Sequence, residues 1–465
     1  MRLGIFGCRI RSLARGLYML SAFRNVFKIP DLRKKILFTA GLLIVERIGA
    51  YIPTAGVDGY QLSQFFEDIA QRRGDTLFGI MNLFSGGALS NCTIFALGIM
   101  PYISASIVLQ LLTAVIPHLE RLMREGETGR RKLTQYTRYG TVALSLFQAF
   151  FISMWLENPE AFGGRLIVPN PGWAFRLMTM ITLTSGTAFL MWIGEQITER
   201  GIGNGISILI TIGIVSRLPT AVGMTYEMMR PGAEGGGRHP LLMVLMLAML
   251  FAVVFAVIML TQGQRKIPVQ YAKRVVGRKV FGGQSTYIPL KVNYGGVIPI
   301  IFASSILMFP ATIGSFVNAG FLRKVSMWLS PGSAGYEICY VLLIIFFCYF
   351  WTATQFNPIQ WADDMKKNGA FVPGVRPGKA TAEMFDSVMT RITLSGAVFL
   401  AVIAVLPSII SGWLKIPYLV ASFFGGTGLL IIVGVLLDTM RQIESHLLMR
   451  HYDGFMKKGK LRGRY

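Results

Sequence analysis

The chain has 465 residues, of which 53% are hydrophobic and only 15% are charged. This composition excludes an ordinary soluble globular protein and is typical of a polytopic membrane protein. The formal net charge of +23 would also suit a nucleic-acid-binding protein, but the distribution of the basic residues along the chain favours a membrane protein.

Ten apolar segments are long enough to cross a membrane as helices. The clearest runs from Leu241 to Thr261, contains no charged residue and would span about 30 Å at ~1.5 Å per residue. We therefore predict an all-α polytopic fold, and an even number of spans places both termini on one side. The predicted spans lie near residues 36–53, 95–115, 140–156, 174–194, 201–216, 241–261, 295–317, 336–355, 392–410 and 417–437.

The basic residues indicate the orientation of these spans. Most of the 46 Lys and Arg residues occur in the two terminal segments and in every second connection. Basic residues resist translocation, so these regions and both termini are expected to be cytoplasmic. They are a basic N-terminal arm over 1–35, the connections 116–139, 195–200, 262–294 and 356–383, and a basic tail over 438–465.

The N-terminal arm and the first span open the chain. The arm shows no apolar core followed by small residues, so a cleavable signal peptide is not expected, and we expect an amphipathic, interfacial segment. The span carries Glu46 next to Arg47. Neighbouring helical positions point about 100° apart, so these two are not expected to pair with each other. A structural role, snorkelling or pairing with a partner helix, is preferred for Glu46 over ion coupling.

The run from Asn82 to Met100 precedes and enters the second span. It joins a short apolar stretch to that span through Gly86 and Gly87. A short apolar helix, a flexible glycine joint and a full span suggest a segment that dips into the membrane from outside and acts as a stopper. From spacing alone, a buried surface loop is the plainer alternative.

A nine-residue motif occurs twice. GIMPYISAS at 98–106 and GVIPIIFAS at 296–304 share their glycine, their proline and three further residues. Proline and glycine inside a span require neighbours or water to satisfy the freed backbone groups, and equivalent breaks in two halves mark a pathway. We therefore expect two kinked helices around a central axis. The halves, 36–218 and 219–437, would hold five spans each and be mutually inverted.

Small residues accompany both copies of the motif. Ser104, Ser106, Ser304 and Ser305 would allow tight but separable helix packing, and such a seam could open sideways. Simple small-residue packing without movement is the alternative for either segment alone.

The sequence lacks the patterns of catalysis or cofactor binding. GETGRRKLT at 126–134 does not have the residue order of a phosphate-binding loop, and GIGNGIS at 201–207 is predicted to be a closely packed, glycine-rich helix start. The four His are scattered and the four Cys show no paired spacing, so no metal or cofactor is expected. Glu195 and Glu199 are expected to be solvated at a cytoplasmic turn.

Two long cytoplasmic loops, 262–294 and 356–383, are rich in basic residues. The first carries no acidic residue, and alternation around VVGRKVF predicts an exposed hairpin. The second would present Arg376 at a tip between two glycine turns. Such loops suit docking to something large and anionic, such as RNA phosphate, while attraction to lipid headgroups is the simpler alternative.

Several blocks together resemble the signatures of the SecY/Sec61-alpha family, the central subunits of protein-conducting translocons. They occur in the family's order from about Arg33 to the tail. The resemblance implies two inverted five-helix halves around a central hourglass pore. The blocks are NLFSGGALSNCTIFALGIMPYISASI, GRRKLTQYTRYGT, FLMWIGEQITERGIGNGISI, GQRKIPVQYAKR, QSTYIPLKVNYGGVIPIIFASSI and NGAFVPGVRPG.

The same resemblance implies a function. The chain would pass unfolded secretory polypeptides across the bacterial inner membrane and release hydrophobic segments sideways into lipid, without being an enzyme. A secondary transporter for a small solute is the alternative, which would require polar or acidic ligands at mid-membrane. A membrane-bound enzyme is disfavoured because no catalytic cluster occurs.

The resemblance also implies roles for individual residues. The plug would cover about 76–89 with its hinge at Gly86 and Gly87. A ring of branched aliphatic side chains would seal around a moving peptide and exclude ions; it would consist of Ile99, Ile103, Ile206, Ile210, Ile301 and Ile431. The lateral gate would include Pro101, Ser104, Ser106, Pro299, Ser304 and Ser305. The docking residues would be Arg265, Lys266, Lys273, Arg274, Arg278, Lys279 and Arg376.

The implied partners are the SecE and SecG subunits, the SecA motor ATPase, the ribosome through its RNA, precursor polypeptides with their signal sequences, and anionic lipids. Two features depart from the family pattern. Glu46 stands where an apolar or aromatic residue is expected beside Arg47, and the arm before Pro30 is longer than usual. Neither feature inherits a role from the family.

Overall fold

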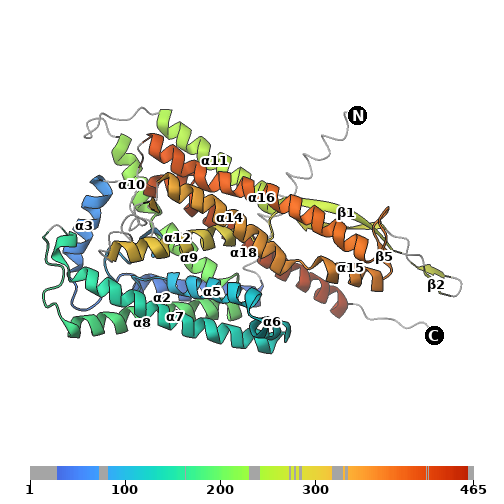
Figure 1. Cartoon of the computed structure of the whole chain (residues 1–465), viewed down its shortest axis with the longest axis horizontal. Helices are drawn as coiled ribbons and strands as arrows, with labels where there is room; N and C mark the ends of the chain where they lie inside the picture. Colours follow the sequence, from blue (N-terminus) through green and yellow to red (C-terminus); the bar gives the residue numbers. More distant parts are fainter. Residues whose placement is uncertain are drawn as a thin grey trace.

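The fold is built from long helices that run in similar directions (Figure 1). It is known from a computed structural model. The structure describes residues 29–72, 82–162, 164–229, 241–271, 274–276, 279–281, 285–316, 328–329, 333–414, 416 and 418–458.

The first half of the described chain consists of helices joined by turns. Three of its helical segments, Glu127–Leu156, Trp173–Arg200 and Gly205–Met229, are long and apolar enough to cross a membrane by themselves. The elements are α2 (Pro30–Gly49), α3 (Gly59–Arg72), α5 (Met100–Val115), α6 (Pro117–Arg124), α7 (Glu127–Leu156), the 3-10 helix η1 (Pro159–Phe162), α8 (Trp173–Arg200), α9 (Gly205–Ser216) and α10 (Leu218–Met229).

The second half adds strands to the helices. Five short strands fall in the two basic loops, so the protein is mainly but not purely helical. The elements are α11 (Leu241–Gln262), β1 (Gln264–Tyr271), β2 (Arg274–Val276), β3 (Lys279–Phe281), β4 (Ser285–Lys291), α12 (Ile298–Phe316), α14 (Ala334–Gln355), α15 (Pro358–Lys367), β5 (Ala370–Phe371), α16 (Lys379–Leu414), α17 (Tyr418–Phe424) and α18 (Thr427–Lys458).

The predicted spans coincide with these helices. Nine of the ten segments each overlap a single helix, and the segment 417–437 overlaps the consecutive pair α17 and α18. By length and apolarity alone, seven helices of the described chain qualify as spans, or eight if α5 and α6 count as one. These two are bent by 104° at Pro117, so α6 turns away from the direction of α5.

The repeated motif begins two helices and does not kink them. Pro101 occupies the first turn of α5, and Pro299 is the second residue of α12. Proline is tolerated there because the first turn has no internal partner for its missing N–H. Gly98 and Gly296 both adopt a φ of 58° just before these starts. The expected kinks are therefore wrong, but the two copies share the same local backbone.

The start of α9 agrees with the sequence prediction. Asn204 caps the helix, and its side chain accepts a hydrogen bond from the Ser207 N–H at 3.3 Å. A Cβ at Gly205 would lie 1.9 Å from the carbonyl oxygen of Gly194 in α8. Only glycine permits this approach, so GIGNGIS is a closely packed helix start, as predicted.

The two halves meet at the centre of the molecule. In Figure 1, α9, α12 and α18 lie between the group of α2, α7 and α8 and the group of α11, α14 and α16. Helix α12 contacts both α5 and α7 of the first half, and α18 contacts α9. The largest apolar cluster draws its buried residues from both halves.

A small sheet extends from one end of the helices. Strand β1 pairs antiparallel with β4 and with β5, while β2 and β3 form a separate antiparallel hairpin that confirms the prediction from VVGRKVF. Ile267, Val269 and Leu290 of the sheet pack with Phe356 and Phe385 in a core of their own. The sheet, α15 and α6 lie at one end of the molecule, and α3 and α10 lie at the other (Figure 1).

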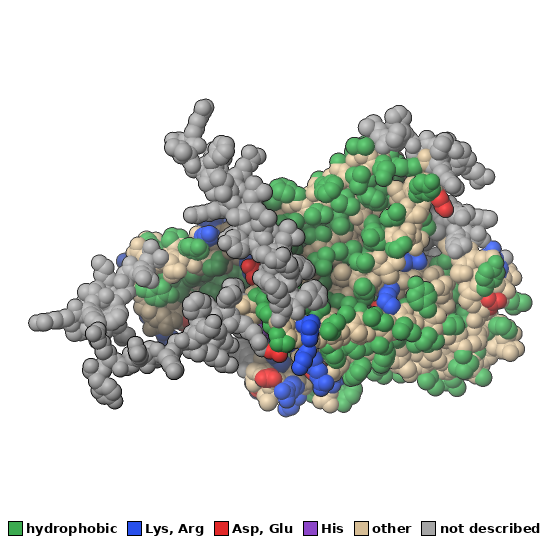
Figure 2. All heavy atoms as spheres, turned by 180° about the vertical axis from the view of Figure 1, so that it is seen from behind, with side chains coloured by type: hydrophobic (Ala, Val, Ile, Leu, Met, Phe, Trp, Pro, Cys, Tyr) green, Lys and Arg blue, Asp and Glu red, His purple; other side chains and the backbone are tan. Residues whose placement is uncertain are grey.

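The outer surface of the helices is strongly apolar. Hydrophobic side chains cover a wide area of the face in Figure 2. On α11, Val244, Phe251 and Phe255 are each more than 60% exposed. Such a continuous apolar exterior matches a lipid environment and not water.

Candidate functional site

The six isoleucines of the expected ring belong to one apolar cluster. Ile99 and Ile103 come from the start of α5, Ile206 and Ile210 from α9, Ile301 from α12 and Ile431 from α18. Five of them are buried and Ile206 is partly buried. Positions far apart in sequence and from both halves are thus brought together, none of them on an outward face.

The described part of the expected plug contacts the same cluster. Residues 76–81 lie outside the described chain, and Asn82 to Phe84 form a short helical turn. Leu83 and Phe84 are buried and belong to the cluster that holds the six isoleucines. The side chains of this segment therefore fill the space beside the isoleucines.

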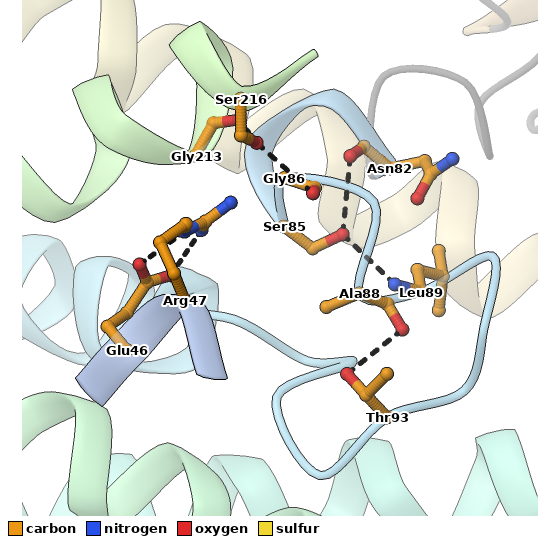
Figure 3. A network of polar contacts seen from close by, with 10 residues as sticks. All are labelled: Glu46, Arg47, Asn82, Ser85, Gly86, Ala88, Leu89, Thr93, Gly213 and Ser216. Carbon is orange, nitrogen blue, oxygen red and sulfur yellow. Dashed lines mark hydrogen bonds and ion pairs between the residues drawn. The ribbon is translucent and has the colours of Figure 1, made fainter. Parts of the chain in front are cut away.

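The loop that follows is held by its own hydrogen bonds. The carbonyl oxygen of Asn82 accepts from the Gly87 N–H at 2.9 Å, and its side-chain oxygen accepts from the Ser90 N–H at 3.2 Å. The Ser85 hydroxyl donates to the Asn82 carbonyl and accepts from the Leu89 N–H (Figure 3). The loop therefore has a defined shape, and Asn82, which sequence reasoning did not single out, is its centre.

The two glycines at the predicted hinge adopt backbone conformations that other residues rarely adopt. Gly86 has a φ of 65° and Gly87 a φ of 92°. The Gly86 carbonyl accepts from the Ser216 hydroxyl of α9 at 3.3 Å. A Cβ at Gly213 of α9 would lie 3.0 Å from the Phe84 carbonyl oxygen. Two small residues of α9 thus let the loop approach its backbone, and only the spacing of small residues in TIGIVS signals this in the sequence.

Glu46 and Arg47 form an ion pair, which corrects the sequence prediction. The Arg47 Nε donates to one carboxylate oxygen of Glu46 at 2.6 Å, and an Nη donates to the other. Their Cβ atoms diverge as expected, but both side chains are long enough for their tips to converge. Glu46 is only 5% exposed, so the pair neutralises a charge inside the protein.

Glu195 is also paired, contrary to the prediction of a solvated cap. Its two carboxylate oxygens accept from Nε and Nη of Arg138 at 2.9 and 2.7 Å. This bidentate contact joins α8 to α7. Glu199 is exposed at the end of α8, as predicted.

The expected gate residues belong to α5 and α12, two helices that contact each other. Pro101, Pro299, Ser304 and Ser305 are buried, while Ser104 and Ser106 are half-buried. Both Ser304 and Ser305 donate to the Ile301 carbonyl of their own helix, at 2.9 and 2.7 Å. These hydroxyls are therefore satisfied without a bond across the seam.

Three of the expected docking residues lie in two exposed places. Arg265 and Lys266 are exposed on β1, and the Lys266 ammonium lies 4.6 Å from the centre of the Tyr287 ring. Arg376 is exposed in a turn whose shape is fixed by a hydrogen bond from the Thr381 hydroxyl to the Arg376 carbonyl at 2.8 Å. Arg274 and Lys279 belong to the β2–β3 hairpin, and Lys273 and Arg278 lie outside the described residues.

The side chains that gather at the described centre of the molecule are mainly aliphatic and aromatic. Within the described ranges, no three His, Cys, Asp or Glu side chains lie close enough to hold a metal ion. The centre is instead an apolar cluster with a hydrogen-bonded loop against it, and such an arrangement is suited to sealing a passage.

Comparison with known proteins gives one consistent result. A model of the SecY family matches residues 93–440. The chain is 50% identical to the protein translocase subunit SecY of Escherichia coli (strain K12) over 439 residues, 94% of this chain and 96% of that protein. It is 46% identical to the protein of the same name from Chlamydia trachomatis serovar D, over 96% of this chain and 100% of that one.

Solved structures agree in fold. A solved protein-conducting channel matches with a TM-score of 0.61 at 17% identity, over 89% of this chain and 92% of that chain. Sec61 in the canine ribosome–channel complex from the endoplasmic reticulum matches with a TM-score of 0.57 at 16% identity, over the same shares. These likenesses establish the fold, and the family match and the sequence identities together establish that the chain belongs to the SecY family.

Proposed function

We propose that this chain forms the channel of a protein translocase and passes unfolded polypeptides across the membrane. The observation that carries this function is the gathering of six isoleucines from both halves, with Leu83 and Phe84 of the plug segment, in one buried cluster. A small-solute transporter would need polar ligands at such a centre. Here the centre is aliphatic.

The cluster can seal the channel at rest and open when a polypeptide enters. Leu83 and Phe84 occupy the space next to the isoleucines, so a polypeptide can enter only after the plug segment moves away. The isoleucines would then close around the chain, since flexible aliphatic side chains adapt to any residue. An empty aliphatic constriction excludes ions because it does not hold water.

The contact between α5, α7 and α12 would be the lateral gate. The Ser304 and Ser305 hydroxyls bond within α12, so separating the helices would break packing contacts but no hydrogen bond of these two residues. A hydrophobic segment in the channel could then leave sideways into lipid. The proposed gate residues are Pro101, Ser104, Ser106, Pro299, Ser304 and Ser305.

The exposed basic loops would face the cytoplasm of a bacterial cell and bind the ribosome and the SecA motor. This is supported by the position of both loops at the same end of the molecule (Figure 1) and by the exposure of Arg265, Lys266 and Arg376. Both termini would lie on this side of the inner membrane. SecE and SecG would assemble around the apolar exterior, with anionic lipids at its cytoplasmic edge.

Reconstitution tests the proposal. The chain, assembled with SecE and SecG in liposomes, should protect a secreted precursor from added protease when SecA and ATP are present. A precursor that stays fully digested under these conditions would contradict the function. A small-solute transporter would instead move a labelled solute without ATP and without a precursor.

A further inference from the structure

The ion pair of Glu46 and Arg47 lies directly beside the plug loop. Glu46 is 5% exposed and binds two nitrogen atoms of the Arg47 guanidinium. Two hydrogen bonds to a carboxylate fix the orientation of a planar guanidinium, whereas a single hydrogen bond would let the group rotate. The remaining edge of the guanidinium is directed toward Gly86 (Figure 3).

Gly86 is enclosed between this guanidinium and α9. A Cβ built at Gly86 would lie 2.9 Å from both Nη atoms of Arg47 and 2.9 Å from the Cα of Gly213. The backbone at Gly86 is therefore in close contact with α2 on one side and α9 on the other. The Ser216 hydroxyl holds the Gly86 carbonyl from the α9 side.

A second arginine flanks the next residue. A Cβ at Gly87 would lie 3.2 Å from an Nη of Arg217. The Arg217 Nε is buried without a hydrogen-bond partner among the described residues. Two guanidinium groups thus border the glycine joint, and Glu46 is the carboxylate that fixes one of them.

We propose that Glu46 is a positioning residue of the plug: it locks the Arg47 guanidinium against Gly86 and so holds the loop in its blocking place. The inference rests on the proposed channel function. Glu46 and Arg47 are neighbours on one helix, so the loop can leave and return while the pair stays intact. Opening therefore leaves no unpaired buried charge on α2, a cost that a salt bridge between plug and helix would incur.

Substitution at Glu46 tests this role. Glu46→Gln keeps the size of the side chain but removes the charge-assisted bonds that fix the guanidinium. The resting ion conductance of the reconstituted complex in planar bilayers should rise roughly tenfold, because hydrogen bonds to charged groups are stronger than those to a neutral amide. Arg47→Lys keeps the positive charge without the planar fork, and it should raise conductance in the same way.

Glu157→Gln is the matched control. Glu157 is as buried as Glu46 and also binds an arginine, but the partners of its carboxylate are Arg176 and the Gly172 N–H at the start of α8, and not groups beside Gly86. This variant should lose stability without increased conductance. Equal leakage in Glu157→Gln and Glu46→Gln would show that general destabilisation opens the channel, and it would overturn the proposal.

Hydrogen exchange separates failure of the inference from failure of the channel function. Amide exchange of residues 82–93, followed by mass spectrometry on the same complex, should be roughly tenfold faster in Glu46→Gln and Arg47→Lys than in the wild type. Unchanged exchange and conductance in both variants would overturn the role of Glu46, even where wild-type precursor transport is normal. Absent wild-type transport with faster exchange would contradict only the channel function.

Discussion

Isoleucine at six positions on four helices gives the centre of the protein a surface without side-chain hydrogen-bonding groups. Such side chains neither coordinate an ion nor prefer one peptide sequence. They pack by dispersion contacts that are individually weak, so an entering chain can displace them one at a time. In the proposed channel, the same residues would therefore block ions at rest and accept many different substrates.

The double variant Ile103→Ala with Ile301→Ala tests the ring at this scale. It removes one side chain from each half at the centre, so we expect the resting conductance to rise by about tenfold as the closed cluster loses its contacts. The control is Ile267→Ala with Leu290→Ala, two aliphatic side chains that are comparably buried in the separate cluster beside the sheet, which contains no residue of the plug loop. Both variants should lose stability, and conductance equal to that of the control would contradict the ring.

Glu157 makes stability depend on pH. Burial opposes ionisation of its carboxyl, but hydrogen bonds from Arg176 and the Gly172 N–H outweigh this, so its pKa is lowered from the usual 4.5. A lowered pKa stabilises the fold above pH 4.5, and the contribution is lost as the pH falls below that value. Glu157→Gln should cost about 2 kcal/mol well above pH 4.5. Thermal unfolding in detergent should show this difference shrinking at lower pH, whereas a constant difference would contradict it.

At the scale of elements, the sequence predicts the features that depend on the residues of a single segment, such as the positions of the apolar helices. Apolar length alone indicates segments that all coincide with helices of the structure, because a membrane helix satisfies its own backbone. The repeated motif is also visible in the sequence, but it marks the starts of two helices and not the kinks that we expected. Pro101 and Pro299 begin helices because Gly98 and Gly296, with a φ of 58°, place the chain in a turn immediately before them.

The remaining features depend on contacts between distant segments. Nothing in the sequence around Ala370 indicates that β5 joins β1, and nothing near Asn82 indicates that Gly213 and Ser216 receive the plug loop. The pairing of Glu46 with Arg47 does not follow from the 100° between neighbouring helical positions, because this angle fixes the directions of the Cβ atoms and not the positions of the side-chain tips. The ring and the hinge are therefore predicted through family resemblance, whereas the residues that contact them from distant segments are found only in the structure.

Arg376 tests the docking loop. Gly374 and Gly378 have φ of 86° and 103°, and the Thr381 hydroxyl holds the Arg376 carbonyl, so the exposed side chain stands on a fixed turn. Arg376→Glu should keep the turn and lower SecA-driven precursor transport about tenfold, since it replaces attraction to a partner by repulsion. Lys367→Glu makes the same change of charge on α15, where the side chain is 77% exposed. Equal transport by the two variants would remove the special role of Arg376.

At the scale of the whole molecule, the halves are joined mainly through apolar contacts at the centre. Helix α12 packs on α5 and α7, and α18 packs on α9. Close polar links between the halves also occur away from the cluster, as in the bond from the Gly203 N–H to the side chain of Gln442 at 2.9 Å. The central contact can therefore loosen while contacts elsewhere keep the halves together, as a hinged channel requires.

The placement of the ends predicts a topology that can be measured. The β2–β3 hairpin and the Arg376 turn belong to loops whose basic charge resists translocation, and the sheet lies opposite α3 and α10 (Figure 1). A specific protease site inserted in the turn between β2 and β3 should be cut in inverted inner-membrane vesicles and resist cutting in intact spheroplasts. A site inserted between η1 and α8 should behave in the opposite way. Cutting of the hairpin site from outside would reverse the orientation, and the basic loops would then be unable to reach a cytoplasmic ribosome or motor.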